Sequence, residues 1–246
     1  MDKHNHRSTK SPLQGEGGKT TCCYCGVGCG IVLHKEKKKG GFVQAMKDYR
    51  TWVLALAYAA CFGIEITVDN VAAIYFVDNF KASIIMAGAL ASIFGFMNLF
   101  ARALGGIFSD KAGKLYGLRG KGLLLAAFLV LEGFGIMLFA QSGSLSMAIV
   151  SMLLFALFLK MANGTTYSIV PFINKEAIGS VAGIVGAGGN IGAMLVGFLF
   201  KSKNISYTQA FTYIGIGVAV IGMLVLVTRF APVSKEQVMV TEPQFA

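Results

Sequence analysis

The sequence predicts an all-α membrane protein with six transmembrane helices and a short non-helical or disordered N-terminal segment. The 246-residue chain is 55% hydrophobic and only 14% charged, whereas soluble domains usually contain about 25% charged residues. Its mean hydropathy is +0.65. Beyond Arg50, apolar runs of about 20 residues or more follow one another, and each is long enough to cross roughly 30 Å of hydrocarbon.

The apolar runs also predict the domain organisation. They cover residues 52–78, 83–108, 121–140, 145–170, 180–200 and 208–230. We therefore expect a flexible tail at 1–17, a cysteine-containing segment at 18–41, a six-helix region at 42–231 and a cytoplasmic tail at 232–246.

Basic residues in the connections predict the orientation. One side of the predicted helices carries Lys35, Lys37, Lys38, Lys39, Lys47, Arg50, Lys111, Lys114, Arg119, Lys121, Lys175, Arg229 and Lys235; the other carries Lys81, Lys201 and Lys203. Because loops rich in Lys and Arg remain in the cytoplasm, we expect both termini there and the helices in the cell (inner) membrane, in contact with lipid. The same pattern explains the net charge of +10 without nucleic-acid binding, since no basic face carries interleaved aromatic residues.

The second predicted helix combines small and polar residues on one face. Ala91, Gly95, Asn98, Arg102, Gly105 and Ser109 recur at steps of four and three residues, which align along a helix. An arginine at a helix centre costs about 2.5–3.5 kcal/mol on insertion scales, and its guanidinium can hold a planar oxyanion through two parallel hydrogen bonds. We interpret Arg102 as an anion-binding residue, with Asn98 either holding the guanidinium in place or adding a second donor. A snorkelling or structurally paired arginine is the alternative.

The fifth predicted helix is rich in glycine. Gly179, Gly183, Gly186, Asn190, Ala193 and Gly197 again follow steps of four and three residues. Small residues allow close helix approach in lipid, and an amide among them should face protein, water or a ligand. Because no βαβ unit surrounds GAGGNIG, it is not a dinucleotide-binding loop. We expect this helix to line a transport path.

Acidic residues in the first predicted helix have two interpretations. Glu65 and Asp69 lie one turn apart and share a face, while Lys160 lies in the fourth helix with Asn163 and Tyr167 on its face. The acids either form an ion pair with Lys160 that fixes helix packing or take part in proton coupling. The sequence leaves both possibilities open.

Four segments together resemble the nitrate/nitrite porter family of the major facilitator superfamily. GGIFSDKAGKLYGLRGK (105–121) is similar to the superfamily's cytoplasmic signature, and GIVGAGGNIGA (183–193) to the family's second nitrate signature. FARALGG (100–106) resembles the helix whose arginine clamps the substrate, and NGTTYSIVPF (163–172) resembles a helix with a pore tyrosine. The resemblance covers about 50–231 and implies helices seven to twelve, the C-terminal half of a twelve-helix porter.

The resemblance also implies a function. It implies transport of nitrate or nitrite, no enzymatic activity and no cofactor requirement for transport. The substrate-binding residues would be Arg102, Asn98, Tyr167, Gly186, Gly188, Gly189, Asn190 and Gly192. Because porters of this type hold substrate between two halves, a second six-helix half is expected from another chain or from a homodimer.

The N-terminal cysteines have a separate resemblance. Cys22, Cys25 and Cys29 have the spacing C-x2-C-x3-C on a basic segment, which favours metal binding over disulfides. TTCCYCGVGCGIVL (20–33) resembles the iron–sulfur N-terminus of assimilatory molybdopterin nitrate reductases over about 18–34, and implies ligands for one [4Fe–4S] cluster, which needs four. The alternatives are a membrane-attached iron–sulfur fragment for electron transfer or an inert truncated fusion product that keeps a reductase remnant.

Overall fold

The chain forms two separate units. A computed structural model describes residues 18–21, 30–33, 41–201 and 205–230, and the units are Met1–Gly40 and Gly41–Ala246. In the first unit, β1 (Gly18–Thr21) pairs antiparallel with β2 (Gly30–Leu33), and Gly18 is opposite Leu33. All described elements of the second unit are helices.

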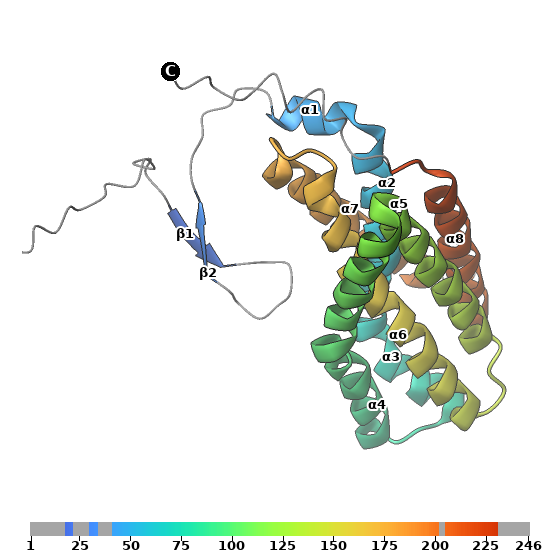
Figure 1. The fold of residues 1–246 in the computed structure, drawn as a ribbon. Helices are drawn as coiled ribbons and strands as arrows, with labels where there is room; N and C mark the ends of the chain where they lie inside the picture. The colour runs from blue at the N-terminus through green and yellow to red at the C-terminus, as the bar shows by residue number, and fades with distance from the viewer. Residues whose placement is uncertain (1–17, 22–29, 34–40, 202–204, 231–246) are drawn as a thin grey trace, which may run out of the picture. The chain divides into compact units, whose positions relative to one another are not determined.

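The long helices of the second unit lie side by side in one bundle, and the short helix α1 lies across one end of it (Figure 1). They are α1 (Gly41–Lys47), α2 (Tyr49–Tyr58), the π-helical turn η1 (Ala59–Gly63), α3 (Ile64–Phe80), α4 (Ile84–Phe96), α5 (Asn98–Ala140), α6 (Leu145–Ile169), the 3-10 turn η2 (Val170–Phe172), α7 (Ile178–Lys201) and α8 (Tyr207–Val227). Ser83, Ser144 and Ser206 each accept a hydrogen bond from a backbone N–H in the first turn of the helix that follows. These caps explain why α4, α6 and α8 begin where they do.

Five helical segments in the described part of the chain are long and apolar enough to cross a membrane: Tyr49–Phe80, Ile84–Ala140, Leu145–Phe172, Ile178–Lys201 and Tyr207–Val227. The outside of the bundle is correspondingly apolar, since Ile84, Ile85 and Val227 are 82%, 86% and 79% exposed. The six predicted membrane helices are not recovered as six separate segments. The difference arises because the predicted runs 83–108 and 121–140 belong to one helical segment of 57 residues.

That long segment bends sharply at Gly117. Gly117 has φ 63° and ψ −155° inside α5, a backbone conformation that only glycine adopts readily. Lys121 Nζ lies 2.7 Å from Asp110 Oδ1 across this bend, although 11 residues of straight helix would span about 16 Å. The chain therefore turns back at Gly117, with helix on both sides of the turn.

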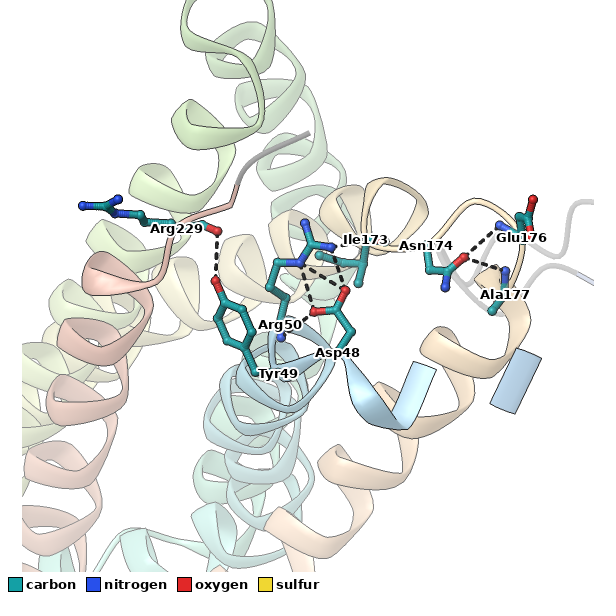
Figure 2. Close-up of polar contacts among 8 residues, drawn as sticks. All are labelled: Asp48, Tyr49, Arg50, Ile173, Asn174, Glu176, Ala177 and Arg229. Atoms are coloured by element: carbon teal, nitrogen blue, oxygen red, sulfur yellow. Dashed lines mark hydrogen bonds and ion pairs between the residues drawn. The ribbon is translucent and has the colours of Figure 1, made fainter. Parts of the chain in front are cut away.

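Polar contacts tie several helix ends together at one end of the bundle (Figure 2). Asp48 and Arg50, at the start of α2, form an ion pair of 2.7 Å, and Arg50 also donates to the carbonyl oxygen of Ile173 beyond η2. The Tyr49 hydroxyl donates to the carbonyl oxygen of Arg229, just after α8. The start of α2 and the ends of α6 and α8 thus lie on the same side of the bundle.

Candidate functional site

A buried carboxylate organises a polar cluster inside the bundle. The Glu65 side chain, 3% exposed, accepts hydrogen bonds from Arg102 Nη2 at 2.9 Å and from Lys160 Nζ at 3.0 Å. The amides of Asn98 and Asn163 donate to its two oxygens as well. Lys160 is completely buried and the Arg102 side chain is 17% exposed. We call these five residues the Glu65 cluster.

Local sequence features bring the three contributing helices together. Asn98 and Arg102 are one turn apart on α5, and Lys160 and Asn163 are almost one turn apart on α6, so each pair projects from one face. A Cβ atom on Gly164 would overlap the carbonyl oxygen of Arg102, and α5 and α6 can therefore cross at this level only with glycine there. The π-helical turn η1 ends just before Glu65, and turns of this kind are frequent at functional sites.

The Glu65 cluster has an excess of positive charge. Two cations, Arg102 and Lys160, surround one anion, Glu65, so the sum is 2 − 1 = +1. Among the described residues, Arg102 Nε is buried and has no hydrogen-bond partner, although Nη2 of the same guanidinium is bonded to Glu65. A buried donor without a partner is costly. The cluster therefore has both a net charge and an unused N–H that suit a monovalent anion.

An aromatic group connects Arg102 with α7. The guanidinium carbon of Arg102 lies 5.9 Å from the centre of the Phe62 ring. Phe62 stacks on Tyr58 with ring centres 4.8 Å apart, and Tyr58 meets the edge of Tyr167 at the same distance. A Cβ atom on Gly189 would lie 2.6 Å from Tyr58 and 2.8 Å from Phe62. The rings therefore pack directly on the glycine surface of α7.

Comparison with known proteins identifies the helical region. Over 186 residues, the chain is 42% identical to the high affinity nitrate transporter 2.5 of Arabidopsis thaliana, an alignment that covers 72% of this chain and 36% of the relative. The chain is homologous to nitrate transporters. Nitrate transporter 2.2 of Chlamydomonas reinhardtii is 38% identical over 205 residues, covering 79% of this chain and 40% of that protein. The nitrate/nitrite transporter NrtP of Picosynechococcus is 34% identical over 145 residues, or 58% and 26% of the two chains.

The homology confirms the resemblance predicted from the motifs and makes this nitrate transporter homologue a multi-pass membrane protein. The alignments span only about a quarter to two fifths of the relatives' lengths. The N-terminal resemblance is confirmed too, because residues 18–51 match the family model described as the molybdopterin oxidoreductase Fe4S4 domain.

The structure brings together only some of the residues predicted from the sequence of this nitrate transporter homologue. Asn98, Arg102, Glu65 and Lys160 meet in the Glu65 cluster, where Lys160 and Glu65 form an ion pair. Tyr167 lies against α7, since a Cβ atom on Gly186 would be 3.4 Å from its hydroxyl. Asp69, one turn beyond Glu65, is exposed.

The α7 glycines divide between two faces. Cβ atoms on Gly188 and Gly192 would lie 2.7 Å and 2.5 Å from the carbonyl oxygens of Ala55 and Ala59, so these two glycines pack backbone to backbone against α2 and η1. Asn190 is exposed and donates from its amide to the carbonyl oxygen of Gly186 on its own helix at 3.1 Å. Within the described residues, nothing lies within 4 Å of the Cβ positions of Gly179, Gly183 and Gly197. Part of the glycine-rich surface is therefore open.

The predicted metal ligands Cys22, Cys25 and Cys29 lie outside the described residues, between β1 and β2. The part of the chain that the structure describes contains no group of three or more His, Cys, Asp or Glu side chains that could hold a metal ion. Cys61 is completely buried in η1, and its thiol donates to the carbonyl oxygen of Ala57.

The structure also adds residues that the sequence did not single out. Tyr58 and Phe62 lie one turn apart on one helix face, but within an apolar run this spacing is also typical of ordinary core residues. Glu132 of α5 is completely buried. As an acidic residue in an otherwise apolar predicted helix, Glu132 carried a usable signal, because intramembrane acids are by default candidates for function.

Proposed function

We propose that the helical region transports nitrate or nitrite across a membrane and has no enzymatic activity. The observation that carries this proposal is the Glu65 cluster, which combines an excess charge of +1 with the unpartnered Nε of Arg102. The homology to proteins named as nitrate and nitrate/nitrite transporters supports the choice of anion. Transport of this kind needs no cofactor.

Arg102 is the proposed anion-binding residue. Nitrate is planar and monovalent, and a guanidinium can offer two parallel N–H groups to such an oxyanion. Glu65 accepts a hydrogen bond from Nη2 at 2.9 Å, and the anion would accept one from the unpartnered Nε, which lies on the same edge of the guanidinium. Asn98 holds Glu65 in place beside it. Lys160 contributes charge from a completely buried position, where screening by solvent is weak.

Aromatic and glycine surfaces form the remaining wall of the proposed path. Tyr167 and Gly186 face each other, and Asn190 with the open glycine face of α7 supplies small and polar groups to the path. Gly188, Gly189 and Gly192 act through packing, because they hold α7 against Ala55, Ala59 and the rings of Tyr58 and Phe62. Anion binding by the backbone of this helix is thus limited to its open side.

We further propose that the helical region crosses the membrane six times. The segment Ile84–Ala140 has 57 residues, and two crossings need about 40. Gly117 would then lie between the two crossings. The bend is joined to the end of α6 by the hydrogen bond from Lys121 Nζ to the carbonyl oxygen of Ser168. The end of the bundle that contains Gly117 carries basic residues, which the positive-inside rule places in the cytoplasm. Both termini then lie on the cytoplasmic side of the cell (inner) membrane.

A second six-helix unit would complete the transport path. Only 17% of the apolar stretch of α7 is buried, against 72% for that of Tyr49–Phe80, and the open face includes Asn190. Transporters of this architecture hold substrate between two units. Light scattering of the purified chain would show a homodimer if a second copy supplies that unit. A monomer that binds no nitrate until another six-helix chain is added would assign the role to a different partner.

Nitrate uptake tests the proposal. Labelled nitrate would be measured in lipid vesicles that contain the wild-type chain, Arg102→Ala, Arg102→Lys or the control Arg229→Ala. Arg229 is exposed, and only its backbone contacts Tyr49. We expect uptake with the wild type and the control and loss of most uptake with both Arg102 variants, since lysine keeps the charge but loses the fork. Equal uptake by wild type and Arg102→Ala would contradict the proposed site.

The match of residues 18–51 to an Fe4S4 domain favours a second candidate function. In this alternative, Cys22, Cys25 and Cys29 hold an iron–sulfur cluster that transfers electrons at the membrane. Iron and acid-labile sulfide would be measured in anaerobically purified protein, with Cys25→Ser against the control Cys61→Ser. Iron that is lost only in Cys25→Ser would support the cluster, and protein without iron would exclude it.

A further inference from the structure

Glu132 is an acidic side chain that the Glu65 cluster does not use. It lies in the second half of α5, is completely buried, and has two carboxylate oxygens without a hydrogen-bond partner among the described residues. The helix around it is tightly packed. A Cβ atom on Gly133 would lie 2.6 Å from the carbonyl oxygen of Gly215 in α8, and one on Gly135 would lie 2.7 Å from Phe155 in α6.

The lack of a partner determines the charge of Glu132. An ionised carboxylate without a counter-ion or a hydrogen bond has a large desolvation penalty inside protein or lipid, whereas the neutral acid has a much smaller one. Ionisable groups in such places neutralise instead of remaining charged. The surroundings of Glu132 therefore favour the neutral, protonated acid over the carboxylate.

The groups around Glu132 do not offer an alternative counter-charge. Cys61 of η1 and Glu65 of α3 interact with it electrostatically. Neither is a cation, and the positive partners of Glu65 are Arg102 of α5 and Lys160 of α6. The α8 residues at this level, Gly215 and Ala219, have no titratable group.

Two further acids lie near the Glu65 cluster, but neither is both buried and without a hydrogen-bond partner, as Glu132 is. Asp69 is exposed, and it interacts electrostatically with Lys160 and Glu65. Glu65 accepts four hydrogen bonds, two of them from cations. Protonation of Glu65 would leave two buried cations without an anion.

We propose that Glu132 is the proton-binding site of the transport cycle. Glu132 is protonated when an anion binds near Arg102, and it releases the proton to water as its O–H bond breaks and a carboxylate remains. With Glu132 neutral, the buried charges of Glu65, Arg102 and Lys160 sum to +1; with Glu132 ionised, the four groups sum to zero. Only the first state attracts a monovalent anion strongly. By linkage, proton binding and anion binding strengthen each other by the same factor.

This proposal rests on the proposed transport function, and a spectroscopic test separates the two. Infrared spectra of the purified full chain in H₂O and D₂O would be compared for wild type, Glu132→Gln and the control Asp69→Asn. A protonated carboxyl group has a C=O stretching band that shifts in D₂O. We expect this band in wild type and Asp69→Asn and its loss in Glu132→Gln. An unchanged band in Glu132→Gln, or no such band in wild type, would overturn the proposal.

Nitrate uptake in lipid vesicles is the second test of the role of Glu132. Glu132→Gln is expected to keep the exchange of labelled for unlabelled nitrate but to lose the stimulation of uptake by an imposed pH gradient. Stimulation equal to wild type would contradict the coupling role. Absence of any wild-type uptake, with the infrared band still present, would refute the transport function and leave the proton site intact.

A folding control keeps the test decisive. Because a neutral acid tolerates replacement by an uncharged residue of similar size, Glu132→Met replaces Glu132→Gln if the latter does not accumulate in the membrane. Failure of both variants to accumulate, with normal amounts of Asp69→Asn, would refute the neutral state of Glu132.

Discussion

Replacement of Glu65 by glutamine should strongly destabilise the helical bundle. Glu65 is 3% exposed and lies 2.9 Å from Arg102 and 3.0 Å from Lys160. Glu65→Gln leaves the buried Lys160 and the partly buried Arg102 without an anion and raises the cluster charge from +1 to +2. Removal of one partner from a buried ion pair costs about 3–5 kcal/mol, and at about 2–4 °C per kcal/mol for a chain of this size the midpoint of thermal unfolding should fall by roughly 6–20 °C.

The buried thiol of Cys61 provides the assay. Cys61 is completely inaccessible in the folded protein, so a thiol-reactive fluorophore reports unfolding of η1 once the four N-terminal cysteines are replaced by serine. A second substitution tests the electrostatic explanation. Glu65→Gln combined with Lys160→Gln returns the cluster to +1 and should recover a large part of the lost stability. The exposed Asp69, changed to Asn, is the control.

Two results would refute this reasoning. The first is a midpoint for Glu65→Gln equal to that of Asp69→Asn, which would mean that the buried cations do not depend on Glu65. The second is a double variant no more stable than Glu65→Gln alone. In that case the loss of stability would come from the changed hydrogen bonds and not from unbalanced charge. Glutamine keeps one acceptor oxygen and replaces the other by an NH2 group, which cannot accept from the surrounding donors.

Two further predictions concern backbone geometry. Gly164→Ala should push α5 and α6 apart at Arg102, whose carbonyl oxygen would overlap the new Cβ atom, and should cost about 1–3 kcal/mol; Gly179→Ala, which meets nothing within 4 Å, is the control. A midpoint unchanged in both variants would show that this crossing adjusts freely. Gly117→Ala should lower the free energy of unfolding by about 1–3 kcal/mol because of the backbone conformation at this residue. Gly106→Ala, with open space around it, should not lower the thermal midpoint measured through the reactivity of Cys61. A smaller loss of stability in Gly117→Ala than in Gly106→Ala would show that the bend does not require glycine.

The sequence predicted the polar side of the site better than its aromatic side. Arg102 and Asn98 could be found because a charged and a polar residue interrupt an apolar run at helical spacing, where each is costly. The pairing of Glu65 with Lys160 was one of two possibilities, since helical spacing gives a face but not the helix that it meets. Tyr58 and Phe62 gave no such signal, because aromatic residues are common in any apolar helix.

The glycine-rich helix shows a second limit. Gly188 and Gly192 are four residues apart, and so are Gly179 and Gly183, which means that both sets form a stripe on α7. Periodicity alone cannot decide which stripe packs inside and which remains open. The choice depends on the short side chains of Ala55 and Ala59, which lie far away in the sequence.

The bend at Gly117 shows why the second and third predicted helices appear as one helical segment. The polar stretch between the second and third predicted helices reads as a loop by composition, yet lysine, alanine and leucine within it are good helix formers. The helix therefore continues into this stretch from both sides, and only the residue with positive φ interrupts it. The reversal of chain direction that we predicted for a whole connecting loop occurs at the single residue Gly117.

The π-helical turn η1 has a consequence for how α3 tolerates insertions and deletions. A π turn holds one residue more than an α-helical turn, and one residue corresponds to about 100° of rotation around a helix axis. The extra residue within Ala59–Gly63 therefore determines the direction in which each α3 side chain points around the helix axis. Loss of a single residue there would rotate Glu65 away from Arg102 and Lys160 by more than a quarter turn, although every side chain of the cluster would still be present. The cluster thus depends on the number of residues before it as much as on their identity.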